Sequence, residues 1–407
     1  MRILIAAAGS RGDIAPYTGL GAELRRAGYE VAVAAADPFA PLVRAAGLEF
    51  RSLPADTRPR PGTGPAPDRR ELLRTAGAFV TELGQGFADA VDGGADLLLL
   101  SATTAPLGWH LAEATGIPSL GVHLQPTAPT GDFPPTVPGV RPLGRLGNRT
   151  TGRLALRIAD RLYDPAVARL RGRLGLPPLS AAAMRRRQER ANWPVLYGFS
   201  TALVRRPADW RPGLDVVGPW WPHVDPTERL PQAVEDFLRA GPPPVLVGFG
   251  SMAAGEGERL GDLAVRALRR AGLRGILQSG SAGLAAEGED VLTVGDLPHA
   301  LLFPRLAAVV HHAGAGTSAA ALRAGVPAVT VPVTADQPFW AGRLAALGAA
   351  TEPIPFASLT AARLAEALRR VVRRPAFAQA AAGAAEHLAG EDGAGRVLLA
   401  VRRLTGG

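Results

Sequence analysis

The stretch RILIAAAGSRGDIAPYTGLGAELRRAGYEVAVAAAD, residues 2–37, decides the fold. Two short, continuously apolar runs, RILIAAAG and EVAVAAAD, flank a segment of helical periodicity, APYTGLGAELRRAGY, which closes with Gly28. Apolar runs of this length that alternate with helices are typical of strands in a parallel sheet covered on both faces. The sequence therefore predicts a strand–helix–strand unit at the start of the chain.

The same alternation occurs in two sets along the 407 residues. ADLLLLSA and PSLGVHLQ continue the first set, and the second contains PPPVLVGFGSM, LRGILQSG, DVLTVGDL, LAAVVHHAG and VPAVTVPVT. This pattern predicts two successive doubly wound α/β halves, and the length also favours two domains. We place the first domain at residues 1–215, a linker rich in Pro, Gly and Trp at 216–241, and the second domain at 242–389.

Composition narrows the classes of function. The chain has no cysteine, which excludes disulfides, thiolate metal sites and a cysteine nucleophile. Its net charge of +9 comes from scattered arginines, aromatic residues make up only 5%, and no nucleic-acid motif occurs, so we expect no nucleic-acid partner. The start of the chain is too short and polar for a signal peptide, and no apolar stretch reaches membrane-spanning length. These features predict a cytoplasmic protein without integral membrane association.

Two parts of the first domain are irregular in sequence. Residues 51–70 form a loop rich in Pro, Gly and Arg, for which we expect no fixed structure. Residues 127–194 contain basic amphipathic helical segments around LALRIADRLY and MRRRQER. The face formed by Arg153, Arg157 and Arg161 has two interpretations, contact with a membrane surface or plain solvation, and the sequence favours solvation.

The strongest functional signal is HHAGAGTSAAALRAGVP, residues 311–327. An apolar run ends there in two histidines, and glycines 314 and 316 precede Thr317 at the start of an alanine-rich helix. Glycines let a ligand approach the backbone, and a helix start offers unpaired N–H groups to an anion. His312 adds a further hydrogen-bond donor. The alternative is a glycine turn with a Thr or Ser N-cap and a structural histidine.

Two further strand ends of the second half carry polar residues. VGFGSM ends in Gly250 and Ser251, a second potential phosphate contact at the same edge of the sheet. Asp336 and Gln337 follow the strand AVTVPV, and an acid beside an amide suits sugar hydroxyls, which need both acceptors and donors. For Asp336 alone, turn chemistry before the next helix is the alternative.

At this point the chain shows a family resemblance. Residues 294–349, VGDLPHALLFPRLAAVVHHAGAGTSAAALRAGVPAVTVPVTADQPFWAGRLAALGA, resemble the donor-binding signature of nucleotide-sugar-dependent glycosyltransferases of family one. GSRGD and the wording LFPR…HHAGAGT…DQPFW resemble most the branch with sterol-type and glycopeptide-antibiotic enzymes. The resemblance implies a GT-B fold, with two Rossmann-like domains facing across a cleft. It also implies an acceptor-binding first domain, a donor-binding second domain and a C-terminal helix, about 390–407, that packs back on the first.

The resemblance assigns roles to single positions in the second domain. It places the diphosphate at His312, Gly314, Gly316 and Thr317 with help from Ser251, the sugar at Asp336 and Gln337, and the base and ribose near His299. Two departures from the family pattern stand out: Ala313 replaces a frequent glycine, which a loop before a helix tolerates, and residues 277–284 lack an aromatic side chain for stacking on the base.

In the first domain, GSRGD ends a strand at the edge where open α/β folds bind ligands. Asp13 is unsuited to gripping a diphosphate but suited to taking a proton from an alcohol, so we interpret it as the general base. The neighbouring Ser10, Arg11 and Gly12 are then assigned to the phosphates, and the family resemblance points to the same aspartate. The competing interpretation makes Asp13 the N-cap of the helix that follows.

These assignments predict an inverting glycosyltransferase that moves a sugar from UDP or TDP to a hydroxyl of a lipophilic or polycyclic small molecule. We expect no cofactor and no metal, since arginine, imidazole and helix-end amides can neutralise the leaving diphosphate. The sequence contains no Asp-x-Asp pair of the kind that would hold a cation. Acceptor, sugar, base and oligomeric state stay open.

Three alternatives remain beside this prediction. An NAD-dependent enzyme fits poorly, because Gly9 and Gly12 do not match G-x-G-x-x-G although Asp37 ends the second strand. A second alternative is an inactive binding or partner protein on the same scaffold. A third is a nucleotide-sugar hydrolase or epimerase, whose acid and base groups would come from His110, Glu113 or His123.

Overall fold

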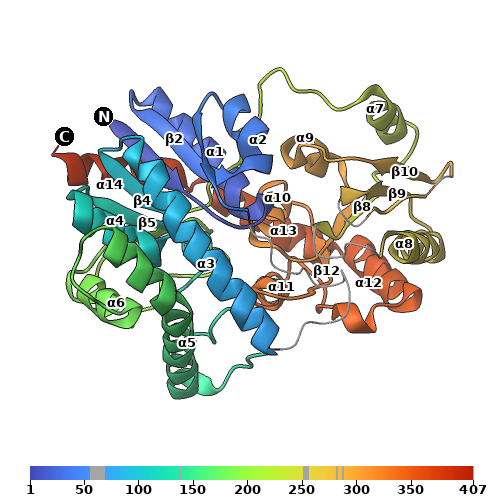
Figure 1. Cartoon of the computed structure of the whole chain (residues 1–407). Helices are drawn as coiled ribbons and strands as arrows, with labels where there is room; N and C mark the ends of the chain where they lie inside the picture. The colour runs from blue at the N-terminus through green and yellow to red at the C-terminus, as the bar shows by residue number, and fades with distance from the viewer. Residues whose placement is uncertain (56–68, 138, 251–255, 281–282, 287, 407) are drawn as a thin grey trace.

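The computed structural model describes residues 1–55, 69–137, 139–250, 256–280, 283–286 and 288–406. It contains two α/β domains that lie side by side, each built on its own parallel sheet (Figure 1). The predicted fold class, two Rossmann-like doubly wound domains, is confirmed. None of the helices in these ranges combines the length and the apolar character needed to span a bilayer.

The first sheet has seven strands in the order β3-β2-β1-β4-β5-β6-β7, all parallel. They are β1 (Arg2–Ala6), β2 (Glu30–Ala36), β3 (Glu49–Leu53), β4 (Leu97–Leu100), β5 (Ser119–His123), β6 (Val195–Tyr197) and β7 (Leu214–Val216). All four leucines of β4 are buried, because helices cover both faces of the sheet. The chain order reverses between β1 and β4, so their carboxyl ends open a crevice for ligand.

Six α-helices accompany the strands of this sheet in the described residues. They are α1 (Arg11–Arg26), α2 (Ala40–Ala45), α3 (Arg69–Asp92), α4 (Ala105–Thr115), α5 (Gly144–Arg173) and α6 (Ala181–Arg190), with one 3₁₀ turn at Asp37–Phe39. The segment predicted as a loop, 51–70, includes the end of β3 and the start of α3, which corrects that prediction at both ends. Its middle, 56–68, lies outside the described residues.

The second sheet has five parallel strands in the order β10-β9-β8-β11-β12. They are β8 (Val245–Gly248), β9 (Gly275–Gln278), β10 (Val291–Val294), β11 (Ala308–His311) and β12 (Ala328–Thr330). The helices are α8 (Gly257–Ala271), α9 (His299–Leu302), α10 (Ala315–Arg323), α11 (Gln337–Ala346), α12 (Ala361–Arg373) and α13 (Pro375–Ala389), with 3₁₀ turns at Phe303–Arg305 and Phe356–Ser358.

The segments between and after the domains are ordered. The stretch assigned to a linker, 216–241, contains α7 (Gln232–Arg239), whose Val234 and Leu238 pack in the core of the second domain. The last helix, α14 (Gly393–Thr405), returns to the first domain and buries Val397 and Val401 against its sheet (Figure 1).

An aromatic cluster joins the two domains. Phe133, from the loop after β5, packs on Phe339 of α11 at 5.3 Å between ring centroids. The Arg343 guanidinium lies 5.2 Å from the first ring and 5.1 Å from the second. Phe199 of the first domain contacts Trp340 of the second at 5.5 Å. These contacts fix how the carboxyl edges of the two sheets face each other.

Candidate active site

The loop after β1 holds Asp13 in a tight local arrangement. The backbone N–H and the hydroxyl of Ser10 both donate to Asp13 Oδ2, at 2.8 and 2.9 Å. Gly9 has φ +145°, and a Cβ at this position would lie 2.5 Å from the same carboxylate oxygen. Glycine at 9 is therefore required both by its backbone conformation and by the closeness of Asp13.

The interpretation of Asp13 as the helix N-cap is wrong. Helix α1 begins at Arg11, so Ser10 is the N-cap and Asp13 is the third helical residue. Its carboxylate reaches back to the N-cap backbone, which is half of a capping box. Asp13 still stabilises the start of the helix, but it does so from the third helical position and not from the predicted N-cap position.

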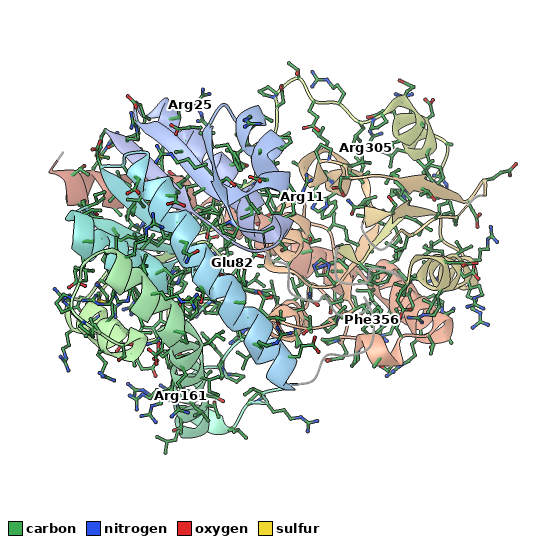
Figure 2. All side chains as sticks on the ribbon, viewed as in Figure 1. Arg11, Arg25, Glu82, Arg161, Arg305 and Phe356 are labelled. Atoms are coloured by element: carbon green, nitrogen blue, oxygen red, sulfur yellow. The ribbon has the colours of Figure 1, made fainter. Side chains whose placement is uncertain are left out.

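Arg11 reaches the other domain. Its guanidinium forms a 3.2 Å ion pair with Asp296, which follows β10, and both side chains are more than half exposed (Figure 2). Gln278 Nε2 donates to the other Asp296 oxygen at 3.4 Å. Gly12 makes no close contact that excludes a side chain, since a Cβ there would lie 3.7 Å from Ser10 Oγ.

The loop after β11 is built around the His312 ring. A Cβ at Gly250 would lie 2.9 Å from this ring, and a Cβ at Gly314 would lie 2.6 Å from its Nε2. The imidazole therefore fills the space between the end of β8 and the start of α10. This space is free because Gly250 and Gly314 have no side chain. Burial lowers the pKa of His312 to about 4, so the ring is neutral near pH 7. Its Nδ1 is buried without a hydrogen-bond partner in the described part of the chain.

The neighbouring histidine has a different environment. His311 is 1% exposed, and its Nδ1 accepts the Ala313 N–H at 3.1 Å. Burial lowers its pKa to about 3, with smaller contributions from His312 and His299. His311 thus shapes the loop from inside the protein, whereas His312 stands beside the helix start.

Ala313 adopts φ +64°, in the left-handed region that favours glycine. The expectation that alanine is tolerated here therefore holds only at a conformational cost. Gly314 is the N-cap of α10, whose first N–H groups have no intrahelical partner. Gly316 is exposed, with nothing within 4 Å of a Cβ built on it, and Thr317 is half-buried on the same turn.

Asp336 and Gln337 lie together at the start of α11 but differ in how they are held. The Trp340 indole N–H donates to Asp336 Oδ2 at 2.7 Å. Gln337 is buried, and its Oε1 accepts the N–H groups of Val333 and Thr334 at 2.8 and 3.0 Å. The Gln337 oxygen thus stabilises the preceding loop, whereas Asp336 interacts with Gln125 across the domain boundary.

Residues of the first domain reach Asp336 from the opposite side. Burial raises the pKa of Asp336, and the negative charge of Asp13 raises it further. Hydrogen bonds from Trp340 and from Gln125, in the loop after β5, act in the opposite direction. Asp336 therefore interacts with two loops of the first domain, through a hydrogen bond with Gln125 and through the charge of Asp13.

His299 lies near the same loops. Its ring stacks on Phe303 with 4.2 Å between centroids. Burial lowers its pKa to about 4, and the charges of Asp296, Arg11 and His312 all act on it. His299 is therefore close enough to both the Arg11–Asp296 ion pair and His312 to feel their charges.

The structure does not bring every candidate to this place. Ser251 lies outside the described residues. His110 and Glu113 are held in the first domain by Arg171, whose Nη1 lies 2.8 Å from His110 Nδ1 and 2.6 Å from Glu113. His123, at the end of β5, is buried with its Nδ1 3.0 Å from Thr127 Oγ1. Acid–base roles for His110 and Glu113 between the domains are therefore wrong, because their contacts belong to the packing of α4 on α5 and, through Arg187, on α6.

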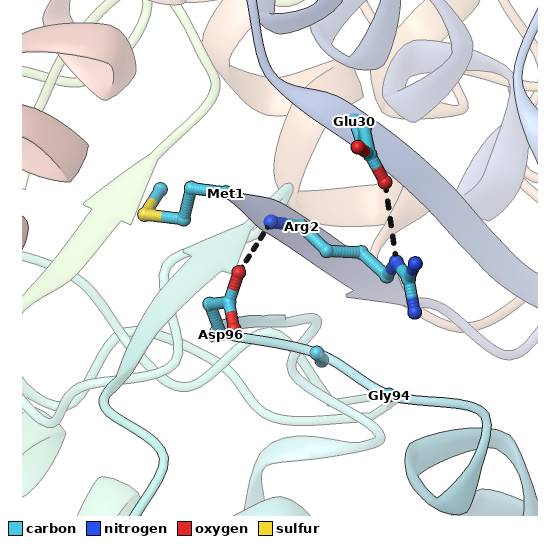
Figure 3. Close-up of a pocket in the computed structure, with 6 residues that line it drawn as sticks. Met1, Arg2, Glu30, Gly94 and Asp96 are labelled. Carbon is cyan, nitrogen blue, oxygen red and sulfur yellow. Dashed lines mark hydrogen bonds and ion pairs between the residues drawn. The ribbon is translucent and has the colours of Figure 1, made fainter.

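A hollow of about 360 Å³ lies at the other edge of the first sheet (Figure 3). Arg2 spans it: its backbone N–H donates to Asp96 at 2.7 Å, and its guanidinium donates to Glu30 at 3.4 Å. These residues stand at the amino ends of β1, β2 and β4, opposite the loop that carries Asp13. This hollow is separate from the candidate active site.

Sequence reasoning missed Gln125, Asp296 and Trp340. Gln125 and Asp296 each follow a strand by two residues, so position at a strand end was the available signal. Trp340 lies one helical turn after Asp336, a spacing that places the two side chains together.

Comparison with known proteins agrees with this arrangement. Residues 3–130 match the N-terminal domain of glycosyltransferase family 28, and residues 277–398 match the C-terminal domain of erythromycin biosynthesis protein CIII-like proteins. O-mycaminosyltylonolide 6-deoxyallosyltransferase of Streptomyces fradiae is 39% identical over 97% of this chain and 95% of its own. Vancomycin aglycone glucosyltransferase of Amycolatopsis orientalis is 34% identical, with 89% of each chain covered.

Solved structures share the fold over the whole chain. The glycosyltransferase of kitacinnamycin has a TM-score of 0.74 at 20% identity and covers 99% of this chain and 98% of its own. VinC, solved in complex with dTDP, has a TM-score of 0.70 at 22% identity and covers 100% of both chains. The fold, the paired loops and the relatives lead to one conclusion: this chain belongs to the nucleotide-sugar-dependent glycosyltransferases of family one and is an enzyme with the GT-B fold.

Proposed function

We propose that the enzyme transfers a sugar, with inversion and without a metal ion, from a nucleoside diphosphate to a hydroxyl of a natural-product acceptor. The observation that carries this proposal is the domain boundary itself, where Asp336 of the second domain is hydrogen-bonded to Gln125 of the first and feels the charge of Asp13. One carboxylate acts on the acceptor, and the other acts on the sugar that lies between them.

The donor diphosphate binds at the start of α10. Its oxygens accept the N–H groups at the amino end of this helix, where the open space at Gly316 admits a ligand. A neutral His312 donates a further hydrogen bond, and the same bond strengthens as the leaving diphosphate gains charge. Arg11 exchanges its exposed Asp296 partner for a phosphate, which is the stronger partner when present.

Asp13 acts as the general base. The acceptor hydroxyl gives its proton to the Asp13 carboxylate while its oxygen attacks the anomeric carbon, and the bond to the diphosphate breaks on the opposite face. This single displacement inverts the anomeric configuration. The two hydrogen bonds from Ser10 orient the carboxylate for that step.

Asp336 binds the sugar. Burial and the charge of Asp13 raise its pKa, because a buried carboxylate beside a second carboxylate is disfavoured, and a hydrogen bond from a sugar hydroxyl would stabilise its charged form. Trp340 and Gln125 fix its orientation, and a sugar hydroxyl donates to it. Gln337 stabilises this site by holding the 333–334 loop with its side-chain oxygen. Its side-chain NH₂ group is the part that can bind the sugar.

The acceptor class comes from the relatives. The names of the similar enzymes refer to a tylonolide, a vancomycin aglycone and sterols, which are natural products. We infer an acceptor of this kind with a free hydroxyl. A cytoplasmic location stays a prediction.

Product formation tests this proposal directly. The purified enzyme is titrated calorimetrically with UDP- and TDP-sugars, and the tightest donor is then incubated with hydroxylated macrolide, glycopeptide and sterol acceptors. Mass spectrometry should find one added hexose or deoxyhexose on the acceptor. NMR should show that the anomeric configuration of the product is inverted relative to that of the donor. Release of free sugar without any glycosylated acceptor would instead assign a hydrolase.

Metal independence is tested in the same assay. We expect turnover in EDTA to stay within about twofold of turnover in magnesium, because the helix amides, His312 and Arg11 neutralise the diphosphate. Loss of turnover in EDTA that magnesium restores would show that a cation is required.

A further inference from the structure

The outer side of α5 carries a continuous column of arginines. Arg145, Arg149, Arg153, Arg157 and Arg161 follow each other at intervals of four residues over roughly 24 Å of the helix. Because each step of four residues turns the helix about 40° past a full revolution, the row winds slowly, and Arg153, Arg157 and Arg161 share one side. All five are exposed, and Figure 2 labels Arg161 at the outer edge of the molecule. Residues 141–159 contain no acidic residue, so the helix itself does not balance this charge.

Apolar side chains run beside the arginines. Leu146 is 85% exposed, Leu154 54% and Ile158 48%, and Leu143 just before the helix is 62% exposed. Of the eight large apolar side chains that are exposed in the described part of the chain, five lie between residues 137 and 158. Scattered exposed leucines need no explanation, but a gathering of this kind marks a contact surface.

Few acidic groups face the column. Asp132 pairs with Arg145 at 2.6 Å, and Asp209, which accepts hydrogen bonds from Thr130 and Gly131, lies near Arg149. Asp160 of α5 itself is buried and pairs with Arg185. Within the described ranges, the remaining arginines at 153, 157 and 161 form no ion pair with an acidic side chain, so the positive charge of this face is uncompensated at its centre.

We propose that this face of α5 docks on a lipid bilayer that contains anionic lipids. A row of cations beside a row of apolar side chains on one helix suits the boundary between headgroups and acyl chains. A second copy of the chain does not fit, because two identical arginine columns would repel each other. The face is the exposed side of a single helix, which favours a flat partner over an inserted peptide.

Docking would set the orientation of the active site. Asn148 of α5 donates to the Gly131 carbonyl at 3.0 Å, in the loop that continues to Phe133 at the domain boundary. This loop therefore lies between the docking face and Asp336. If the acceptor is lipophilic, as the proposed function states, the enzyme would meet it at the bilayer surface; the docking itself does not depend on the acceptor.

Vesicle binding tests the proposal with the intact enzyme. Sedimentation compares vesicles of phosphatidylcholine alone with vesicles containing 30% phosphatidylglycerol. We expect binding only to the anionic vesicles, weakened by salt. The variant Arg153→Gln, Arg157→Gln, Arg161→Gln should lose roughly 100-fold in partition coefficient. The matched control Arg266→Gln, Arg373→Gln, Arg402→Gln removes the same charge from exposed positions elsewhere and should bind like the parent.

Insertion is followed with a fluorophore, which the absence of native cysteine makes specific. The fluorescence of a nitrobenzoxadiazole label at Leu154→Cys should shift to the blue on anionic vesicles. A label at Leu399→Cys on α14, where the leucine is 47% exposed against 54% for Leu154, should not shift. Equal loss of binding in the two arginine variants would overturn the proposal, since net charge alone would then drive it. Retention on immobilised polyglutamate without vesicle binding would overturn it too, in favour of an acidic macromolecule.

Discussion

The loop after β1 and the loop after β11 have the same architecture but carry different functional groups, a carboxylate in the first and an imidazole in the second. Each joins a buried parallel strand to a helix, and each uses glycine to make room for one functional side chain. Gly9 makes room for the Asp13 carboxylate, and Gly314 makes room for the His312 ring. The backbone therefore places both loops at the boundary between the domains, and the side chain decides whether a loop takes a proton or holds an anion.

Asp13→Asn should have the largest effect on this comparison. Asn can still accept both Ser10 hydrogen bonds through its side-chain oxygen, but it is no base. We expect turnover to fall by roughly 10²–10⁴, with donor affinity and melting temperature unchanged. Steady-state kinetics, calorimetry and thermal melting measure the three quantities.

Asp37→Asn is the matched control, because Asp37 follows β2 at the same edge of the sheet and accepts from Ser52. It should leave turnover unaffected. If Asp13→Asn kept normal turnover, Asp13 would be a structural helix-start residue only, and the base would have to be sought at His123.

His312→Ala tests the anion-binding loop. The lost hydrogen bond to charged phosphate is worth roughly 1.5–3 kcal/mol, or about 10- to 150-fold in donor affinity. Turnover should fall as well, because the bond strengthens in the transition state. Calorimetry with the donor and single-turnover kinetics separate the two losses. His223→Ala is the control, because it makes the same substitution in the segment that connects the domains. It should alter neither donor affinity nor turnover. If both variants behaved alike, His312 would have a structural role only.

The two loops also differ in how far the sequence predicts them. Apolar runs predict both sheets and therefore the edge where the loops meet, since burial on two faces leaves an unbroken apolar pattern. The start of α1 was ambiguous because Ser10 and Asp13 both suit a helix start, although their spacing matches a capping box. The Arg11–Asp296 pair and the Gln125 contact depend on how the domains face each other, which no local pattern encodes.

The buried His311 should make the stability of the enzyme depend on pH. His311 has a folded pKa of about 3 against about 6.5 when unfolded, so the unfolded chain binds more protons between these values. Its contribution to stability is complete above pH 6.5 and is lost as the pH falls. In His311→Asn the side-chain oxygen can still accept the Ala313 N–H, but nothing titrates.

Denaturant unfolding at pH 7.5 and pH 5 measures this difference. From pH 7.5 to pH 5 the parent should lose about 2 kcal/mol more of its unfolding free energy than His311→Asn does. The comparison uses the change with pH, so a constant packing loss in the variant does not affect it. Parallel pH curves would mean that His311 titrates alike in both states.

The smallest effect concerns two alanines with left-handed backbones, Ala313 at φ +64° and Ala335 at φ +57°. Each alanine precedes a functional residue, Gly314 or Asp336. The left-handed backbone destabilises the folded state by roughly 1–2 kcal/mol at each alanine, and this strain would be absent with glycine. Glycine costs about 0.4–1 kcal/mol in the unfolded chain, and at Ala313 it also removes a fully buried methyl worth about 0.8 kcal/mol. Ala335 is exposed and has no buried methyl to lose.

Ala335→Gly should therefore stabilise the enzyme by about 0.5 kcal/mol, whereas Ala313→Gly should be nearly neutral. Thermal melting of both variants decides it: equal gains would show that the buried methyl of Ala313 contributes nothing, and two losses would show that neither backbone is strained.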